Sequence, residues 1–393
     1  MNPQALQGLK VIELGQLIAG PFAAKTLADF GADVIKIEPP EGGDPLRKWR
    51  LLREGTSVWW EVSSRNKRSV CADLRQPEGQ ALVRRLAAEA DVLIENFKPG
   101  TLEAWGLGWE ELHALNPRLI MLRMSGYGQT GPYAGKPGFG LLAEAMGGLR
   151  HLTGEPGRVP VRTGVSIGDS IAALHGVIGV LLALNHRHSS GEGQMVDCAL
   201  YESVFNLMES LLPEYDAFGV VRERAGSALP GIAPSNAYRC RDDGPDGQGG
   251  GYVLIGGNGD SIYRRLMHAI GRDDLGNDPE LAHNDGRARR SAELDAAIEA
   301  WTLQHPIDEV IATLDAAGVP VGKAYTAADI AHDPQYLARG MVLQVRDSHG
   351  LPLKVPGIAP RLSATPGAIQ HPAPRLGEHS EQVGNSPAWP GRN

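Results

Sequence analysis

The sequence predicts an α/β fold, with a parallel sheet in a large domain and a smaller α+β domain after it. Residues 9–14 and 33–38 are apolar enough to form strands, and residues 22–30 between them have a helical pattern. A strand, a helix and a strand within about thirty residues form a βαβ unit, which requires a parallel sheet. At 393 residues the chain is also longer than one core usually supports, so two domains are expected.

The rest of the chain continues this alternation and departs from it near residue 205. In the first part, helices are expected at 78–90 and 171–184, and strands at 91–95, 119–124 and 194–200. In the second part, a strand at 252–255 precedes helices expected at 261–271, 291–304 and 306–317. We therefore predict a large domain at 1–205, a linker at 206–224, a small domain with a glycine loop at 225–325, and a linker and C-terminal segment at 326–393.

The composition argues against several classes of protein. With 42% hydrophobic and 21% charged residues, the chain has the composition of a globular protein and not of a disordered one. Its net charge of −8 argues against a nucleic-acid partner, because such partners are bound through a basic surface. Cys71, Cys198 and Cys240 are far apart and odd in number, which predicts a reducing compartment with neither a disulfide framework nor a metal site.

Two features of the chain bear on its localisation. Glu13 interrupts the first apolar segment, so the N-terminal region does not have the order of a signal peptide. The longest apolar run, 171–184, has 14 residues, fewer than the roughly 20 that a membrane helix needs. We therefore expect a cytoplasmic protein without a membrane partner.

The loop at residues 15–20 lies where a parallel sheet binds its ligand, because it follows the carboxyl end of the first strand. Glu38, which ends the second strand, would suit the ribose of a dinucleotide. However, Gly15 and Gly20 do not have the G-x-G-x-x-G spacing of a dinucleotide site. Pro21 stands where a P-loop needs its lysine. The loop therefore argues against a nicotinamide cofactor and against a P-loop nucleotide.

Basic residues are concentrated between residues 47 and 75, where eight Lys and Arg side chains stand against three acids. Trp49, Trp59 and Trp60 are interleaved among them. This basic excess has two interpretations, an anionic ligand or a solvated charged surface. Without further context the solvated surface is the better interpretation.

A carboxylate stands at the start of the most apolar helix of the chain. Ser166, Asp169 and Ser170 are residue types that cap helices, and the helix at 171–184 is expected to be buried on most sides. The dipole at a helix N-terminus favours an ionised carboxylate. Asp169 is therefore either a plain cap or a reactive carboxylate, and caps are the commoner case.

A series of short motifs runs along the whole chain in a fixed order. The first motif is made of residues 12–14, 19–21 and 27–38. The others are Asn66-Lys67-Arg68-Ser69, Glu95-Asn96-Phe97-Lys98-Pro99-Gly100, Gly126-Tyr127-Gly128-Gln129-Thr130-Gly131-Pro132, Gly193-Gln194-Met195-Val196-Asp197, Ala338-Arg339-Gly340-Met341 and Pro374-Arg375-Leu376-Gly377-Glu378-His379. Through them the sequence resembles the class III coenzyme A-transferases of the CaiB/BaiF type.

The resemblance implies an activity and a catalytic residue. Asp169, within Gly168-Asp169-Ser170, matches the family's catalytic aspartate, which passes through an aspartyl anhydride and an aspartyl-CoA thioester. The donor would be formyl-, acetyl- or succinyl-CoA. The acceptor would be a small dicarboxylic acid, oxalate first and then succinate, glutarate or a branched C4–C5 diacid. Backbone N–H groups of a glycine loop, Gly256, Gly257, Asn258 and Gly259, are the candidates to stabilise the oxyanion.

The resemblance also implies an interlocked homodimer and a coenzyme A site without a tightly bound cofactor. Each subunit would have a Rossmann-like large domain, to which the C-terminal segment returns, and the basic excess would serve the phosphates of coenzyme A. Arg162 and His151 are candidates to bind the second carboxylate of the acceptor. The residues that the resemblance assigns to coenzyme A are Ile18, Ala19, Ala72, Arg75, Asn96, Phe97, Lys98, Lys136 and Phe139.

Two alternative functions share this fold. An α-methylacyl-CoA racemase needs a histidine opposite the aspartate, whereas the matching stretch here is Gly138-Phe139-Gly140. Phenylalanine cannot exchange a proton, which argues against this alternative. A non-catalytic acyl-CoA-binding homologue would keep the fold without the chemistry, and the intact Asp169 and glycine loop argue against it.

Overall fold

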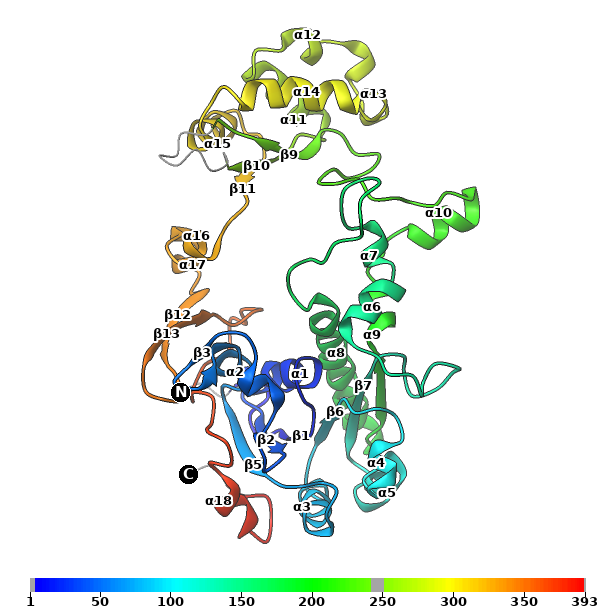
Figure 1. Ribbon diagram of the computed structural model, residues 1–393, viewed down its shortest axis with the longest axis vertical. Coiled ribbons are helices and arrows are strands. Elements are labelled where there is room, and N and C mark those ends of the chain that lie inside the picture. Colours follow the sequence, from blue (N-terminus) through cyan, green and yellow to red (C-terminus); the bar gives the residue numbers. More distant parts are fainter. Residues whose placement is uncertain (1–3, 242–250, 392–393) are drawn as a thin grey trace. The chain divides into compact units, whose positions relative to one another are not determined.

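The computed structural model of the chain describes residues 4–241 and 251–391, which form two compact units. The first unit comprises residues 1–150, 162–221 and 334–393, and the second comprises 151–161 and 222–333. Each unit is therefore assembled from segments that are far apart in the sequence, as the colours of Figure 1 make visible.

A six-stranded parallel sheet forms the centre of the first unit and confirms the predicted α/β fold (Figure 1). In spatial order its strands are β5 (Lys67–Cys71), β2 (Asp33–Glu38), β1 (Lys10–Glu13), β6 (Val92–Glu95), β7 (Ile120–Ser125) and β8 (Met195–Ala199). The strand order reverses between β1 and β6, as in a Rossmann-like sheet. The carboxyl ends of these two strands are therefore the topological switch point, where such sheets bind ligands.

Helices cover both faces of this sheet. Helices α1 (Ala19–Asp29) and α8 (Ile167–Ser190) share one apolar core with strand residues such as Val11. Helices α3 (Pro77–Ala87) and α5 (Trp109–Leu115) share the other core with Ile12. Neighbouring residues of one strand thus point to opposite faces and both are buried, which is typical of a parallel sheet.

The other elements of this unit are short. They are η1 (Pro45–Lys48), β3 (Leu52–Arg53), β4 (Thr56–Ser57), α2 (Val58–Ser63), α4 (Thr101–Ala104), α6 (Gly140–Met146), α9 (Leu200–Phe205), α10 (Leu211–Phe218), α17 (Pro334–Ala338), β12 (Val342–Arg346), β13 (Pro352–Pro356) and α18 (Ser380–Gly384). A single helical turn, α7 (Leu149–Leu152), lies at the boundary between the two units.

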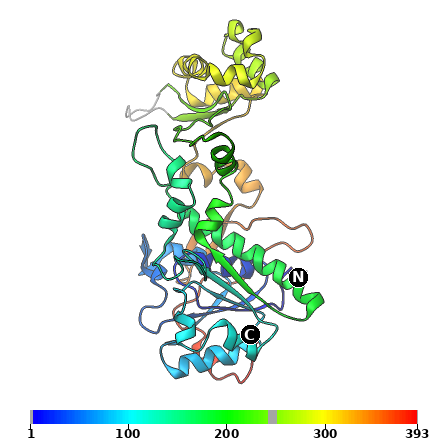
Figure 2. The same cartoon turned by 90° about the vertical axis from the view of Figure 1, so that its right-hand side faces the viewer.

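Helix α8 is longer and more exposed than the sequence predicts. It has 24 residues, and its length and composition would allow it to cross a membrane. It instead packs along β7, β8 and α1, as a core helix does (Figure 2). Leu174, Ile178 and Leu182 on its other face are 48 to 65% exposed. For the single chain, the expectation that this helix is buried on most sides is wrong. The apolar run at 171–184 also predicted a helix that is shorter than α8. An apolar run does not reveal which of its faces meets the chain's own sheet.

The second unit is built on a three-stranded antiparallel sheet, with β10 (Tyr252–Gly256) between β9 (Ser235–Arg239) and β11 (Val321–Lys323). The helices of the unit are α11 (Asp260–Ala269), α12 (Asp273–Gly276), η2 (Pro279–Leu281), α13 (Asn284–Arg289), α14 (Ser291–Thr302), α15 (Ile307–Ala316) and α16 (Ala327–Ile330). Buried side chains such as Val253 and Ile255 share one apolar core with residues of α11, α14 and α15, and the other helices of this unit are short. This arrangement is the smaller α+β fold that the sequence predicts.

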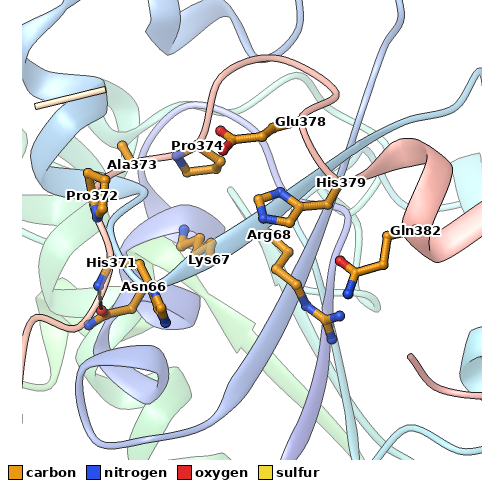
Figure 3. A pocket seen from close by; sticks show the side chains of 10 residues that line it. All are labelled: Asn66, Lys67, Arg68, His371, Pro372, Ala373, Pro374, Glu378, His379 and Gln382. Carbon is orange, nitrogen blue, oxygen red and sulfur yellow. Dashed lines mark hydrogen bonds between the residues drawn. The ribbon is translucent and has the colours of Figure 1, made fainter. Parts of the chain in front are cut away.

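The C-terminal segment covers β5, which is an edge strand of the parallel sheet. Asn66 Oδ1 accepts the N–H groups of Gln370 and His371, and His379 N donates to Ser69 O at 2.9 Å. Between strand and tail lies a cavity of about 240 Å³ (Figure 3). It is lined by Asn66, Lys67, Arg68, His371, Pro372, Ala373, Pro374, Glu378, His379 and Gln382. The tail thus protects an edge that could otherwise pair with another strand.

Candidate active site

The loop at the switch point, residues 15–20, is held from both sides. Asn96, directly after β6, accepts a hydrogen bond from Gln16 N through Oδ1 and donates one to Gln16 O through Nδ2, each at 2.8 Å. The two glycines of the loop touch, since a Cβ on Gly15 would lie 3.0 Å from Gly20 Cα. The loop is therefore fixed at the position where an open α/β sheet binds its ligand.

Behind this loop lies a buried group of charges, the lysine cluster, made of Glu13, Lys36, Asp44 and Lys67. Lys36 Nζ lies 2.7 Å from Glu13 Oε1 and 2.9 Å from Asp44 Oδ2, and Lys67 Nζ lies 2.7 Å from Glu13 Oε2. Burial alone would lower the pKa of Lys36, but the charges of Asp44 and Glu13 raise it. Asp44 also accepts the N–H of Leu17 at 3.0 Å, which holds Leu17 at a φ of 64°. The lysine cluster therefore helps to set the shape of the loop.

Much of the basic excess at 47–75 is used inside the first unit. Four of its basic side chains are 7% exposed or less. Each pairs with a carboxylate at 2.6 to 2.8 Å: Arg47 with Glu38, Arg65 with Asp29, Lys67 with Glu13 and Arg68 with Asp33. For these four, both the solvated-surface interpretation and the phosphate interpretation are wrong. Buried charges need partners, and their partners come from the fold itself. The same pairing explains why β5, which begins with two of these residues, is absent from the strands predicted above.

Most of the residues that the resemblance assigns to coenzyme A lie at the carboxyl ends of three strands. Ile18 and Ala19 lie at the start of α1 after β1, Ala72 and Arg75 follow β5, and Asn96, Phe97 and Lys98 follow β6. The structure joins the first and third groups, because Asn96 is hydrogen-bonded to the 15–20 loop. Arg75 is 74% exposed, and its Nε lies 2.8 Å from Asp73 Oδ1. A phosphate at Arg75 would thus compete with a neighbouring acid.

Lys136 and Phe139 belong to a separate loop, which closes on itself. A Cβ on Gly126 would lie 2.7 Å from Gly138 Cα, so the two ends of the loop are in contact. The ammonium of Lys136 lies over the ring of Tyr133, 3.5 Å from its centroid. Phe139 is 66% exposed and is followed by the first residue of α6. This loop therefore leads directly to the residue that contacts Asp169.

Asp169 lies in the first turn of α8, where it faces the start of α6. A Cβ on Gly140 would lie 2.1 Å from Asp169 Oδ2, so a larger residue would occupy the space of the carboxylate. Ser166, and not Asp169, is the N-cap residue of α8. Burial raises the pKa of Asp169 to about 6, the charge of Glu144 adds to this rise, and Arg162 opposes it. A half-buried carboxylate with a raised pKa is typical of a functional group rather than of a plain cap.

Glu144 is the residue near Asp169 that sequence reasoning missed. It lies on α6, is 0% exposed, and accepts a hydrogen bond from Arg150 Nε through Oε2 at 2.7 Å. In sequence it is one glutamate in a short helix and carries no motif. Its importance comes from burial and from the packing of α6 on α8, neither of which its spacing indicates.

The glycine loop of the second unit connects β10 to α11. The N–H of Gly256 donates to Pro320 O and that of Gly257 to Pro234 O, each at 2.9 Å. The N–H groups of Asn258 and Gly259 have no hydrogen-bond partner among the residues that the structure describes. Of the four candidate oxyanion donors, these two are therefore available in this conformation.

A buried arginine donates hydrogen bonds to the glycine loop. Arg287 is 0% exposed, and its Nη2 donates to Asn258 O and to Asp260 Oδ1, each at 2.7 Å. Its Nε donates to Ala233 O at 3.0 Å. The carbonyl of Asn258 is thus fixed by a charge-assisted hydrogen bond, which also restricts the neighbouring N–H groups.

The two candidates for the second carboxylate of the acceptor lie in different units. Arg162 belongs to the first unit, where its Nη2 donates to Ser166 Oγ at 3.3 Å. His151 belongs to the second unit, and its Nε2 lies 3.4 Å from Glu223 Oε2. Within the described residues 4–241 and 251–391, no group of three His, Cys, Asp or Glu side chains is arranged to hold a metal ion.

Three comparisons relate this chain to known proteins. The model of CoA-transferase family III matches residues 6–380. The chain is 50% identical over 382 residues to succinyl-CoA–D-citramalate CoA-transferase of Chloroflexus aurantiacus, covering 97% of this chain and 93% of the relative. It is 42% identical over 383 residues to the alpha subunit of succinyl-CoA–L-malate CoA-transferase from the same organism, covering 96% and 87%. The crystal structure of a CAIB/BAIF family protein from Brucella suis has a TM-score of 0.84 at 39% identity, covering 98% and 99%.

Proposed function

This chain belongs to CoA-transferase family III, and with that premise we propose that it moves coenzyme A from succinyl-CoA to a C4 or C5 dicarboxylic acid. As a CoA-transferase it acts on acyl-CoA thioesters and dicarboxylic acids. The observation that carries the finer proposal is the 50% identity, over nearly all of both chains, to a succinyl-CoA–D-citramalate CoA-transferase. Oxalate, the first acceptor in the sequence-based order, has no support from the relatives reported above. We therefore place citramalate and malate before it.

We propose Asp169 as the nucleophile of this transfer. Its carboxylate oxygen would bond to the acyl carbon of succinyl-CoA while the C–S bond breaks and the thiolate leaves, which gives an aspartyl anhydride. The thiolate would then attack the aspartyl carbonyl and release succinate. The acceptor carboxylate would attack the aspartyl thioester, which gives a second anhydride and frees the thiolate again. The thiolate would then attack the acyl carbon of the acceptor, which forms the product acyl-CoA and releases Asp169 as a carboxylate. Its contact with Gly140 supports this role, because any side chain at position 140 would fill the space that the carboxylate of Asp169 occupies.

Each carbonyl addition in this scheme places negative charge on an oxygen, which needs hydrogen-bond donors. We propose the N–H groups of Asn258 and Gly259 for this purpose, each worth roughly 3 kcal/mol by analogy with known oxyanion donors. Their support is that both lack a partner among the described residues and that Arg287 fixes the loop.

We further propose that a second copy of this chain covers the exposed apolar surfaces of the first unit. Leu174, Ile178 and Leu182 form an exposed apolar row on α8, and Tyr215 and Phe218 on α10 are 58% and 79% exposed. Exposed apolar surface of this kind on a soluble chain marks an interface. Light scattering coupled to gel filtration should give twice the mass of one chain. A monomeric mass would contradict the proposal, and a requirement for a second kind of chain would indicate a heteromer like the malate enzyme.

Trapping of the intermediate tests the proposed function. The protein is incubated with succinyl-CoA and then with hydroxylamine, which converts an activated aspartyl group into a hydroxamate. We expect mass spectrometry to find the hydroxamate at Asp169, and Asp169→Asn to lose at least about a thousandfold in kcat. Initial rates with citramalate, malate, glutarate and oxalate then rank the acceptors, with a monocarboxylate as the control. Absence of the hydroxamate, or full activity of Asp169→Asn, would contradict the mechanism.

A further inference from the structure

Two acidic side chains, Asp169 and Glu144, occupy the contact between α6 and α8. Gly140 begins α6 and meets Asp169 Oδ2, and Glu144 follows Gly140 by four residues, so both lie on the same side of the helix. A Cβ on Gly168, the residue before Asp169, would lie 3.1 Å from Glu144 Cγ. The first turns of α6 and α8 are therefore in contact, and Glu144 lies in this contact. We call these two residues the carboxylate pair.

The charge of Glu144 is only partly compensated. It is 0% exposed, and Arg150 Nε contacts Oε2 at 2.7 Å. Its other oxygen, Oε1, has no hydrogen-bond partner among the described residues, and neither has Arg150 Nη2. A buried carboxylate normally uses both oxygens, because burial without a partner costs free energy. This arrangement therefore leaves negative charge beside Asp169 that the fold could have neutralised more fully.

We propose that Glu144 is a positioning residue that promotes acylation of Asp169 by repelling its free carboxylate. This inference rests on the proposed function, since it concerns the same nucleophile. When the bond from Asp169 to the acyl carbon forms, the C–S bond breaks and the negative charge leaves with the thiolate. Asp169 is then neutral in the anhydride and in the thioester, so the repulsion exists only in the free enzyme. Repulsion of this kind raises the free energy of the starting carboxylate relative to the acylated forms.

The electrostatics at Asp169 are consistent with this role. Burial contributes most to its raised pKa, and Glu144 contributes in the same direction. Arg162, from the segment that leads into α8, acts in the opposite direction. Arg150 donates a hydrogen bond to Glu144 through Nε. Two acids and two arginines, from α6, α8 and the segments next to them, are therefore the charges to consider in a test.

The test compares pH profiles of Glu144→Gln and the unmodified protein. Glutamine keeps the shape of the side chain and removes its charge. We expect the acid limb of kcat to move to lower pH by about one unit, and kcat on the plateau to fall about tenfold, since one unit corresponds to a factor of ten. KM for succinyl-CoA should not change, because Glu144 is buried away from solvent. Glu144→Asp, which keeps the charge, should recover most of the lost kcat.

Asp91→Asn is the matched control. Asp91 Oδ1 pairs with Arg187 Nη2 at 2.8 Å, so this variant also breaks a carboxylate–arginine pair, here one between the residue before β6 and the last turns of α8. Arg187 lies 18 residues after Asp169, about 27 Å along the helix. The control should leave the pH profile unchanged, which separates a local charge effect from a general loss of an ion pair.

Two outcomes would overturn the inference. One is a folded Glu144→Gln protein with the acid limb and kcat of the unmodified protein. The other applies if Glu144→Gln does not fold, and it uses the variant Arg150→Gln. Removal of this cation should move the acid limb of kcat to higher pH. An acid limb that does not move would overturn the inference. In either case the hydroxamate at Asp169 of the unmodified protein reports separately on the proposed function.

Discussion

The lysine cluster and the carboxylate pair are two groups of buried charge in the same unit, and they differ in how completely their charges are matched. In the lysine cluster, two carboxylates lie among two lysines. Each oxygen of Glu13 lies 2.7 Å from a lysine Nζ, although Oε2 makes this ion pair without a hydrogen bond, and Asp44 contacts Lys36 and the N–H groups of Leu17 and Leu46. In the carboxylate pair, Glu144 is paired with Arg150 through Oε2, but its neighbour is a second acid, Asp169, on which its charge acts.

The difference indicates two uses of buried charge. A network in which two lysines face two carboxylates holds the backbone around it in place, here the loop at 15–20. A partly matched carboxylate beside a nucleophile retains repulsion that only the reaction removes. The first use contributes to the shape of a binding site, and the second contributes to the reactivity of one side chain.

The largest expected effect tests the matched network. Lys36→Met should lower the free energy of unfolding by about 3 to 5 kcal/mol, because it leaves two carboxylates buried with less compensation. Urea denaturation followed by tryptophan fluorescence measures this loss. Glu144→Gln should cost clearly less in the same experiment, since it removes a charge that is already poorly matched. Equal losses for the two variants would contradict the comparison.

A smaller effect of opposite sign is expected at Asp169. Its pKa is raised to about 6, so between its ordinary value and pH 6 the folded chain binds more protons than the unfolded chain. The free energy of unfolding should therefore fall as the pH rises through this window. Asp169→Asn removes this term and should be more stable by up to about 3 kcal/mol at pH 7.5. Thermal unfolding at pH 7.5 and at pH 4 measures it, and a gain that persists at pH 4 would have another cause.

The smallest effect is expected outside both groups, at an arginine that the fold does not bury. Arg75 is exposed and already paired with Asp73, so its contact with a phosphate would be screened by water and shared with an acid. Arg75→Ala should raise KM for succinyl-CoA about fivefold or less and leave kcat unchanged. Arg84→Ala, an exposed arginine on α3, serves as the control. A large change in KM would mean that Asp73 releases Arg75 when the substrate binds.

Much of the fold could be predicted from the sequence. Five of the six strands of the parallel sheet were identifiable because each contains neighbouring apolar residues, which point to opposite faces of the sheet. The helices at 261–271, 291–304 and 306–317 agree with α11, α14 and α15 to within two residues at each end. Strand β5 was not identifiable, because Lys67 and Arg68 are buried by means of partners that lie far away in the sequence.

By itself the sequence determined the alternation of strands and helices, the place of Asp169 at a helix start and the motifs of the family. These properties depend on residues close together in the chain. Only the tertiary structure decided that four of the eight basic residues at 47–75 are internal, that one face of α8 is exposed and that Glu144 lies beside Asp169. The physical reason is that burial and charge pairing depend on which distant segments meet, and local spacing carries no information about that.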